Sequence, residues 1–512
     1  MQRATRLALC GLELLVLSAL VVTTRCANWR DVFIDGGIYF TDADCYARMT
    51  RARLCYENPG TIIRHHEFEN FPAGITPHTT APFDYAIVLL AACLRPLTAN
   101  PLDVAGALVS PLIALVGGWF LWWWMRRMGF AWRFVGLLLY ATSPIIIHAT
   151  ELGRPDHQSL ALVLVLIAAS AEWSLRVQPS RSGSILAGAA WASAIWVSAY
   201  EPLLLFLIAA LCSLRMKFRR ERWIVFGSIV AVALLIERRG FVLPEIWRNQ
   251  HVKKWLTAIG ELSPVPLFSA TWLEWCGLFV LVAPLLIALG FRRRANPPTV
   301  ILLLLGVSFA ATLFEARWGY FCAALLAIAL PSLFAIVRSK IVAVVFALVG
   351  FAPILSGWDR ALWPNESLLA ARAEHRAEMR DVRAASQAMI TSGPTAFIAP
   401  WWLSPAIAYW SGNNGVAGSS HESINGIVDA ARFYLATDDE QARAILQQRR
   451  VQWVLAYDAD RVAKNAATIL GFAVPPGSLA FTLGRTPSRA PGFLRPAYQN
   501  GTCTLFSVNN SQ

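Results

Sequence analysis

The chain has 512 residues, 56% of them hydrophobic and 15% charged, and this composition excludes a soluble domain for its first 356 residues. A net charge of +13 would favour nucleic acid as the partner of a soluble protein, but here the basic residues separate apolar segments. We therefore expect a membrane protein that contacts anionic lipids and no nucleic acid.

The first 356 residues are predicted to cross a membrane about eleven times, because apolar segments recur at lengths that suit a hydrocarbon core of about 30 Å. The first segment follows Arg3 and Arg6 as in a signal peptide, but no A-x-A site follows, so we expect an uncleaved helix. The predicted spans are residues 7–23, 103–124, 131–149, 158–175, 183–199, 201–214, 222–237, 271–290, 298–314, 318–336 and 340–356.

Basic residues in alternate connections predict a cytoplasmic N-terminus. They are Arg126, Arg127, Arg133, Arg176, Arg181, Arg215, Lys217, Arg219, Arg220, Arg222, Arg292 to Arg294, Arg338 and Lys340. Residues 24–102 and 238–270 are then outer loops. The apolar segment 86–97 is too short to span and contains Arg95 and Pro96, so we expect a re-entrant or interfacial helix against the outer leaflet.

Residues 357–512 are more polar and are predicted to form a separate, soluble α/β domain on the outer side. Short strands are expected at residues 396–400, 451–457 and 503–508. Thr437 and Glu440 form a capping-box pattern that predicts a helix reaching Arg450. Of the nine cysteines, Cys45 and Cys55 would face an oxidising compartment, where a disulfide between them is possible.

Four acidic residues in three distant loops all fall on the outer side in this topology: Asp42, Asp44, Asp156 and Glu261. Carboxylates that converge from separate loops suit a hard divalent cation, Mg²⁺ or Mn²⁺. Each acid alone has a simpler interpretation. Asp42 and Asp44 could be solvated or cap a helix, Asp156 could complement a helix dipole, and Glu261 could form a surface ion pair.

Arg317 lies at an outer membrane edge, where it could bind a phosphate or carboxylate, pair with Glu315, or extend to the interface. Trp401 and Trp402 could line a binding groove or pack the outer domain onto the membrane. Three loop histidines, His65, His66 and His78, receive no assigned role. The sequence contains no P-loop, G-x-S-x-G or HExxH motif, so nucleotide hydrolysis and serine or zinc hydrolysis are not supported.

The order of these features resembles the catalytic subunit of oligosaccharyltransferase, a glycosyltransferase of the GT-C class. Asp44 before Cys45 and Tyr46 is similar to the family's first acidic motif, and Asp156 in GRPDHQS to the second. Glu261 resembles the glutamate of a mobile outer loop. Arg317, followed by Trp318, resembles the family arginine near the lipid diphosphate. Trp401 and Trp402 lie where the family has its WWDYG motif, and residues 435–446 resemble the helix downstream.

The resemblance implies transfer of a sugar or oligosaccharide from a polyprenyl-(di)phosphate donor to an acceptor at the outer face. Asp44, Asp156 and Glu261 would be catalytic, the four acids would hold the metal, and Arg317, Trp401 and Trp402 would bind substrate. Leu403, Ser404 and Pro405 replace the Asp-Tyr-Gly that recognises the acceptor hydroxyl, so the acceptor is left open between peptide, lipid and glycan.

Two alternatives to protein glycosylation remain. The departures favour a GT-C transferase that modifies a lipid or polysaccharide, and the non-enzymatic alternative is a transporter of lipid-linked glycans. A transporter usually has charges near the midplane and repeated halves, whereas here the acids lie at the outer edge. We expect a multi-pass protein of the bacterial inner membrane with its C-terminal domain in the periplasm.

Overall fold

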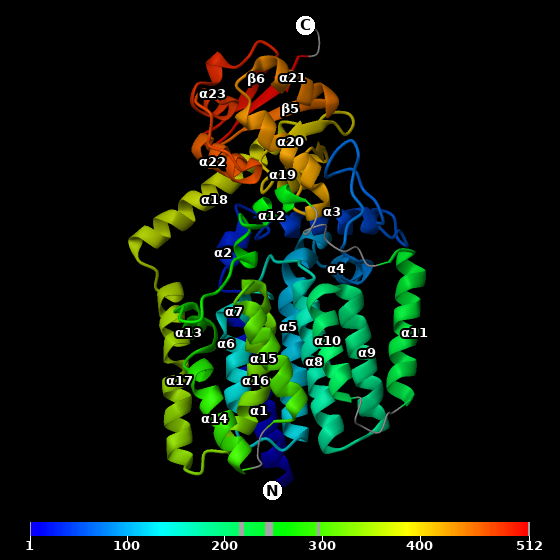
Figure 1. Cartoon of the computed structure of the whole chain (residues 1–512), viewed down its shortest axis with the longest axis vertical. Coiled ribbons are helices and arrows are strands. Elements are labelled where there is room, and N and C mark those ends of the chain that lie inside the picture. Colours follow the sequence, from blue (N-terminus) through cyan, green and yellow to red (C-terminus); the bar gives the residue numbers. More distant parts are fainter. Residues whose placement is uncertain (1, 214–219, 241–248, 294–296, 510–512) are drawn as a thin grey trace.

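The computed structural model describes residues 2–213, 220–240, 249–293 and 297–509. A helical bundle forms the lower part of the molecule in Figure 1, a sheet-containing region forms the top, and short elements lie between them. The bundle helices are α1 (Gln2–Arg25), α5 (Pro101–Arg127), α6 (Arg133–Thr142), α7 (Pro144–His148), α8 (Gln158–Val177), α9 (Arg181–Val197), α10 (Tyr200–Ser213), α11 (Arg220–Glu237), α13 (Thr271–Cys276), α14 (Phe279–Arg293), α15 (Thr299–Thr312), α16 (Gly319–Ala335) and α17 (Lys340–Leu362).

Five segments among the described residues are long and apolar enough to cross a membrane, and the chain is therefore a polytopic helical membrane protein. They are Leu7–Arg25, Pro101–Arg127, Gln158–Val177, Ala316–Ala335 and Lys340–Leu362. The remaining predicted spans coincide with shorter helices. Arg215, Lys217, Arg219 and Arg294, which contributed to the predicted topology, lie outside the described residues.

Helix α16 is the centre of the bundle, because nearly all of its side chains are buried. Small residues such as Ala323 and Ala327 let the neighbouring helices approach closely, as is usual in membrane bundles. Two predicted spans are each divided into two helices. The chain bends between α6 and α7 at Ser143, before Pro144, and between α13 and α14 at Gly277, whose φ is +63°.

The layer between bundle and top contains α2 (Trp29–Val32), β1 (Phe33–Ile34), β2 (Gly37–Ile38), α3 (Ala43–Glu57), α4 (Ala81–Leu94), α12 (Gln250–Leu256), η2 (Gly260–Leu262) and η3 (Ala316–Trp318). Helix α4 overlaps the helix predicted near residues 86–97, but it begins and ends earlier in the chain. Pro82 occupies its first turn, and the helix ends before Arg95. Cys45 and Cys55 are both free cysteines on α3. Their separation of ten residues is about 15 Å along a helix, which is too far for a disulfide.

The top region contains α18 (Glu366–Gln387), α19 (Ser404–Ser411), η4 (His421–Ser423), α20 (Ile424–Leu435), α21 (Asp439–Gln448), α22 (Ala459–Leu470), α23 (Leu479–Arg485) and η5 (Pro487–Arg489). Five strands form its sheet in the order β4 (Asn414–Gly415), β3 (Ala396–Ile398), β5 (Val451–Ala456), β7 (Thr504–Val508) and β6 (Leu494–Gln499). Strand β3 pairs in parallel with β4 and β5, whereas β7 is antiparallel to both of its neighbours.

The predicted cap of α21 was wrong by one residue. Asp438, not Thr437, is the N-cap, and its carboxylate accepts the backbone N–H groups of Glu440 and Gln441. The helix ends at Gln448, before Arg450, which has a positive φ of 51°.

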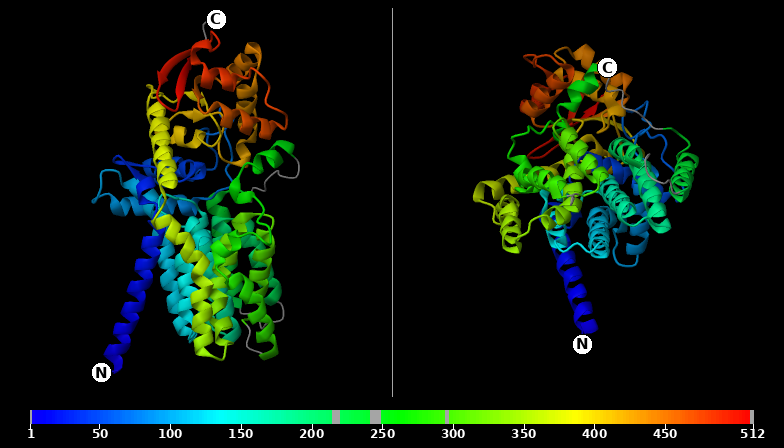
Figure 2. Two further views of the ribbon diagram at one scale, coloured as in Figure 1. Left: turned by 90° about the vertical axis from the view of Figure 1, so that its left-hand side faces the viewer. Right: turned by 60° about the horizontal axis from the view of Figure 1, so that its bottom comes forward.

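The top region contacts the bundle side through several elements. Figure 2 shows α18 rising from the end of α17 along one side of the molecule. Arg376 and Arg380 on α18 pair with Asp31 and Asp35 of the intermediate layer, at 2.8 and 2.7 Å. Val252 and Trp255 of α12 belong to the hydrophobic core of the top region. The intermediate layer is thus held between bundle and sheet.

Candidate active site

A cavity of about 1080 Å³ lies where the bundle meets the intermediate layer and the top region. Its wall includes Asp44 from α3, Asp156 from the loop before α8, Glu261 from η2 and Arg317 from η3. These residues are far apart in sequence, so the fold brings four of the predicted site residues to one chamber. Asp42 lies beside them but is not among the residues that line the cavity.

Helix α3 positions the first two acids. Asp42 is its N-cap, and its Oδ1 accepts the backbone N–H of Cys45 at 2.9 Å. Asp44 therefore lies in the first turn, where a negative charge is favourable. Asp44 is exposed to the cavity, but the protein atoms around the cavity displace much of the water near its carboxyl. This desolvation, together with the charges of Asp42 and Asp156, raises its pKa to about 8.

Arg154 connects two of the acids. Its guanidinium pairs with Asp42 at 2.9 Å and also with Glu261, which accepts a further hydrogen bond from Tyr320 at 3.2 Å. Although Arg154 is close to Asp156 in sequence, its guanidinium forms ion pairs with the other two acids. Glu261 therefore pairs with a buried arginine and does not form the surface ion pair that was its simpler interpretation.

Asp156 is buried and pairs with His157, with 2.6 Å between Oδ1 and Nδ1. Burial alone would raise the pKa of Asp156, but His157 and Arg154 hold it well below its usual range. His157 in turn lies 3.2 Å from Arg48. Asp156 is thus an ionised carboxylate at the cavity wall.

Arg317 forms an ion pair with Glu201 at 2.8 Å and lies against Gln158. It therefore neither pairs with Glu315 nor extends to the membrane interface. Glu201 is a residue that the sequence interpretation missed, although an acid inside an apolar span is a recognised functional signal. Arg48 and Arg51, also on the cavity wall, both pair with the buried Asp84 of α4 at 2.8 and 2.6 Å.

Trp401 and Trp402 lie away from this wall, because neither is among the described residues that line the cavity. The Trp401 ring packs edge-on against Trp255, and its Nε1 donates to Asn465 at 2.9 Å. Arg461 lies over the ring of Trp402. Trp255 lines the cavity in their place.

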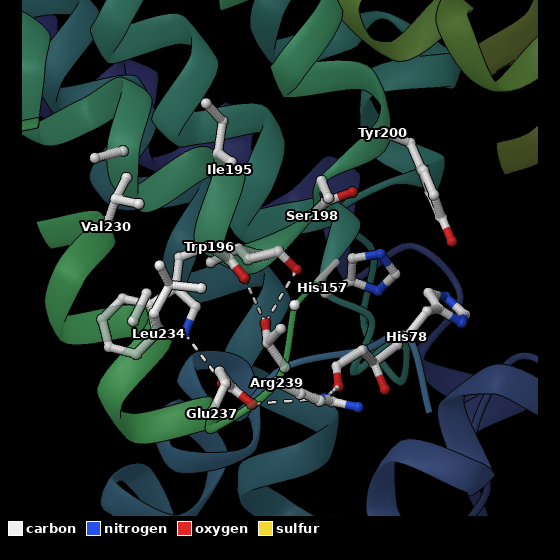
Figure 3. Close-up of a pocket in the computed structure, with 17 residues that line it drawn as sticks. His78, His157, Ile195, Trp196, Ser198, Tyr200, Val230, Leu234, Glu237 and Arg239 are labelled. Carbon is white, nitrogen blue, oxygen red and sulfur yellow. Dashed lines mark hydrogen bonds and ion pairs between the residues drawn. The ribbon is translucent and has the colours of Figure 1, made fainter. Parts of the chain in front are cut away.

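A second pocket adjoins the first and shares His78 and His157 with it. Its apolar side chains come from α9 and α11, among them Ile195, Val230 and Leu234, and Figure 3 shows the polar Glu237 and Arg239 on one side of them. At this rim of the pocket, Glu237 accepts the indole N–H of Trp196 at 3.0 Å and pairs with Arg239 at 3.5 Å. The pocket is therefore apolar between α9 and α11 and charged at its rim.

Only two of the four predicted metal ligands at the cavity are available to a hard cation. Asp44 and Asp156 offer carboxylate oxygens that no arginine pairs with, whereas Asp42 and Glu261 are engaged by Arg154. Among the described residues, no three of these acids have ligand oxygens within 4.8 Å of one another. Two carboxylates are the most that this arrangement offers a Mg²⁺ or Mn²⁺ ion without rearrangement.

Solved structures share this architecture, although no protein-family model and no curated protein matches the chain. The archaeal oligosaccharyltransferase AglB from Archaeoglobus fulgidus, in complex with an inhibitory peptide and a dolichol-phosphate, matches with a TM-score of 0.65 at 14% identity, over 91% of this chain and 71% of that one. The same protein with Zn and sulfate matches equally well, over 92% and 70%.

ArnT from Cupriavidus metallidurans in the apo state matches with a TM-score of 0.55 at 13% identity, over 99% of this chain and 98% of that one. Both are glycosyltransferases of the GT-C class. The predicted GT-C fold is thereby confirmed.

Proposed function

We propose that the protein is a membrane glycosyltransferase that moves a sugar or oligosaccharide from a polyprenyl-(di)phosphate donor to an acceptor at the outer membrane face. The observation that carries this proposal is the single cavity that gathers Asp44, Asp156 and Arg317. The dolichol-phosphate bound by the similar archaeal enzyme supports a polyprenyl donor.

Asp44 and Asp156 would hold the Mg²⁺ or Mn²⁺ ion. Asp42 and Glu261 would join them only if Arg154 releases their carboxylates. A bound divalent ion would supply Lewis-acid stabilisation of the negative charge that develops on the leaving phosphate.

The fixed positive charge of Arg317 would bind the phosphate beside the acids. Glu201 orients the guanidinium by pairing with its Nε, which leaves further N–H groups for an anion. Arg48 and Arg51 add positive charge to the same wall. An ionised carboxylate such as Asp156 can accept a proton or hydrogen bond from an amide or hydroxyl nucleophile.

A specific observation favours a lipid or glycan acceptor over asparagine. Leu403 is buried, and the Ser404 hydroxyl is buried against the carbonyls of Ala399 and Pro400, at 3.2 and 3.1 Å. Pro405 has no polar side chain. The side chains of these residues therefore present no free hydrogen-bond donor for the hydroxyl of an Asn-x-Ser/Thr sequence.

The finer topology is part of the proposal. We infer eleven spans within a membrane part of residues 1–356, followed by a soluble α/β domain of residues 357–512. The acids and the C-terminal domain would face the periplasm of a bacterial inner membrane. The basic connections predicted to be cytoplasmic support this orientation.

The decisive experiment incubates the purified protein with a labelled polyprenyl-linked sugar, with and without Mn²⁺, and offers peptide, lipid and glycan acceptors separately. We expect metal-stimulated transfer, and mass spectrometry of the products identifies the acceptor. Movement of intact donor across vesicles without any transfer would instead establish a transporter.

A further inference from the structure

Three potential metal ligands meet beside the cavity, and two of them, His78 and His421, line its wall. The three are His78, from the outer loop before α4, and His421 and Glu422, from η4 of the top region. The His78 ring lies 6.4 Å from the ring of His157, the partner of Asp156. One ligand atom from each lies within 4.8 Å of the other two, and the two imidazole rings are 5.0 Å apart. Two segments separated by more than 300 residues thus contribute to one cluster.

The carboxylate of Glu422 is already oriented for a ligand. Its Oε1 accepts the backbone N–H of His78 at 2.6 Å and lies 2.9 Å from the Nδ1 of the same residue. Its other oxygen, Oε2, is buried without a hydrogen-bond partner and lies 3.4 Å from His421 Nδ1. The backbone bond would thus support the carboxylate while Oε2 binds a cation.

Two further buried atoms at the same place lack partners. His421 Nε2 and Ser420 Oγ make no hydrogen bond to any residue that the structure describes, although each is shielded from solvent. Leaving several buried polar atoms unsatisfied in adjacent residues is unfavourable, and such groups usually have a partner in the functional state. A bound cation would satisfy the imidazole and the carboxylate together.

We propose that His78, His421 and Glu422 bind one Zn²⁺ ion in a site separate from the acid pair. Two imidazoles and one carboxylate are a known zinc ligand set, whereas the carboxylates of Asp44 and Asp156 suit harder ions. The zinc would tie the first outer loop to the top region. The proposal stands whether or not the protein transfers sugars.

The test measures zinc bound to the full-length protein in detergent. The protein is stripped with EDTA and incubated with Zn²⁺ in excess Mg²⁺, which competes for the carboxylate site, and bound zinc is counted by plasma mass spectrometry. We expect about one zinc per chain. Glu422→Gln and His421→Ala should each lower zinc affinity about 100-fold or more, because each removes a direct ligand.

The matched control is a histidine–glutamate pair elsewhere in the molecule. His375 and Glu378 lie one helical turn apart on α18, with 3.7 Å between Nδ1 and Oε2. His375→Ala should bind zinc like the unmodified chain. Equal zinc binding by Glu422→Gln, His421→Ala and this control would overturn the proposal.

A second measurement needs no variant. The X-ray absorption spectrum of the zinc-loaded, unmodified protein should show scattering from two imidazoles at about 2.0–2.1 Å. A coordination shell without imidazole would overturn the proposal even if the variants failed to fold.

Discussion

At the scale of single residues, Arg154 decides how much negative charge the cavity presents. It lies next to Asp156 in sequence, separated only by Pro155, yet pairs with Asp42 and Glu261. The ion-pair partners of Arg154 could not be predicted from the neighbouring sequence. The backbone between Arg154 and Asp156 directs their side chains to different neighbours. Arg154 thus engages the carboxylates of two acids, and the carboxylates of Asp44 and Asp156 are left for a cation.

The acid pair provides the sharpest test of the proposed chemistry. Asp44→Ala and Asp156→Ala should each lower transfer at least 10²-fold, because charge stabilisation at the phosphate would be lost. Expression and membrane insertion should not change. The control is Asp35→Ala, which removes an exposed acid paired only with Arg380. Near-normal transfer by both site variants would refute the assignment, and the assay is initial rate with labelled donor.

Glu69 gives a prediction about pH. Burial and the nearby charge of Glu422 raise its pKa to about 7, while the backbone N–H of Ser419 donates to its Oε1 at 2.8 Å. Between the ordinary glutamate pKa of 4.5 and about 7, the folded chain keeps a proton on Glu69 that the unfolded chain releases. The free energy of unfolding should therefore fall as pH rises through this range, by at most about 1.4 kcal/mol per pH unit.

Glu69→Gln removes this titration and keeps an oxygen for Ser419. The melting temperature of the variant relative to the unmodified protein should thus be higher at pH 8 than at pH 5. A difference that does not vary with pH would show that Glu69 titrates normally.

At the scale of elements, Asp84 joins α3 to α4. It is fully buried and accepts from both Arg48 and Arg51, and Arg48 also contacts His157. Asp84→Asn should lower the free energy of unfolding by about 3–5 kcal/mol, because two buried guanidinium groups lose their charge partner. The control Asp35→Asn breaks an exposed pair and should cost no more than about 1 kcal/mol. Thermal unfolding in detergent distinguishes the two, and equal melting temperatures would contradict the prediction.

The positions of the helices were easier to predict than their breaks. Apolar length is a local property, so the predicted spans coincide with helices. The break at Gly277 depends on a distant helix, since a Cβ there would lie 2.1 Å from the Gly350 carbonyl oxygen. Trp401 and Trp402 were predicted to bind substrate because they lie where the family has its WWDYG motif. Trp255, which lines the cavity, belongs to no recognised motif and could not be predicted in this way.

At the scale of the whole molecule, the proposed orientation can be tested by chemical labelling. Thr437 in the top region and Ser182 in the first turn of α9 are both exposed. In a cysteine-free background, a membrane-impermeant maleimide should label Thr437→Cys in intact spheroplasts, and Ser182→Cys only after permeabilisation. The reverse pattern would invert the topology and move the acids to the cytoplasm.

The pocket between α9 and α11 has a consequence for how the turnover rate should depend on the concentration of the lipid-linked donor. Its apolar walls come from two bundle helices, and it shares His78 and His157 with the cavity that holds the acids. A long-chain donor reaching the chamber this way would diffuse in two dimensions within the lipid sheet. We therefore expect the rate per molecule to follow the mole fraction of donor in proteoliposomes, and to stay constant when the whole suspension is diluted.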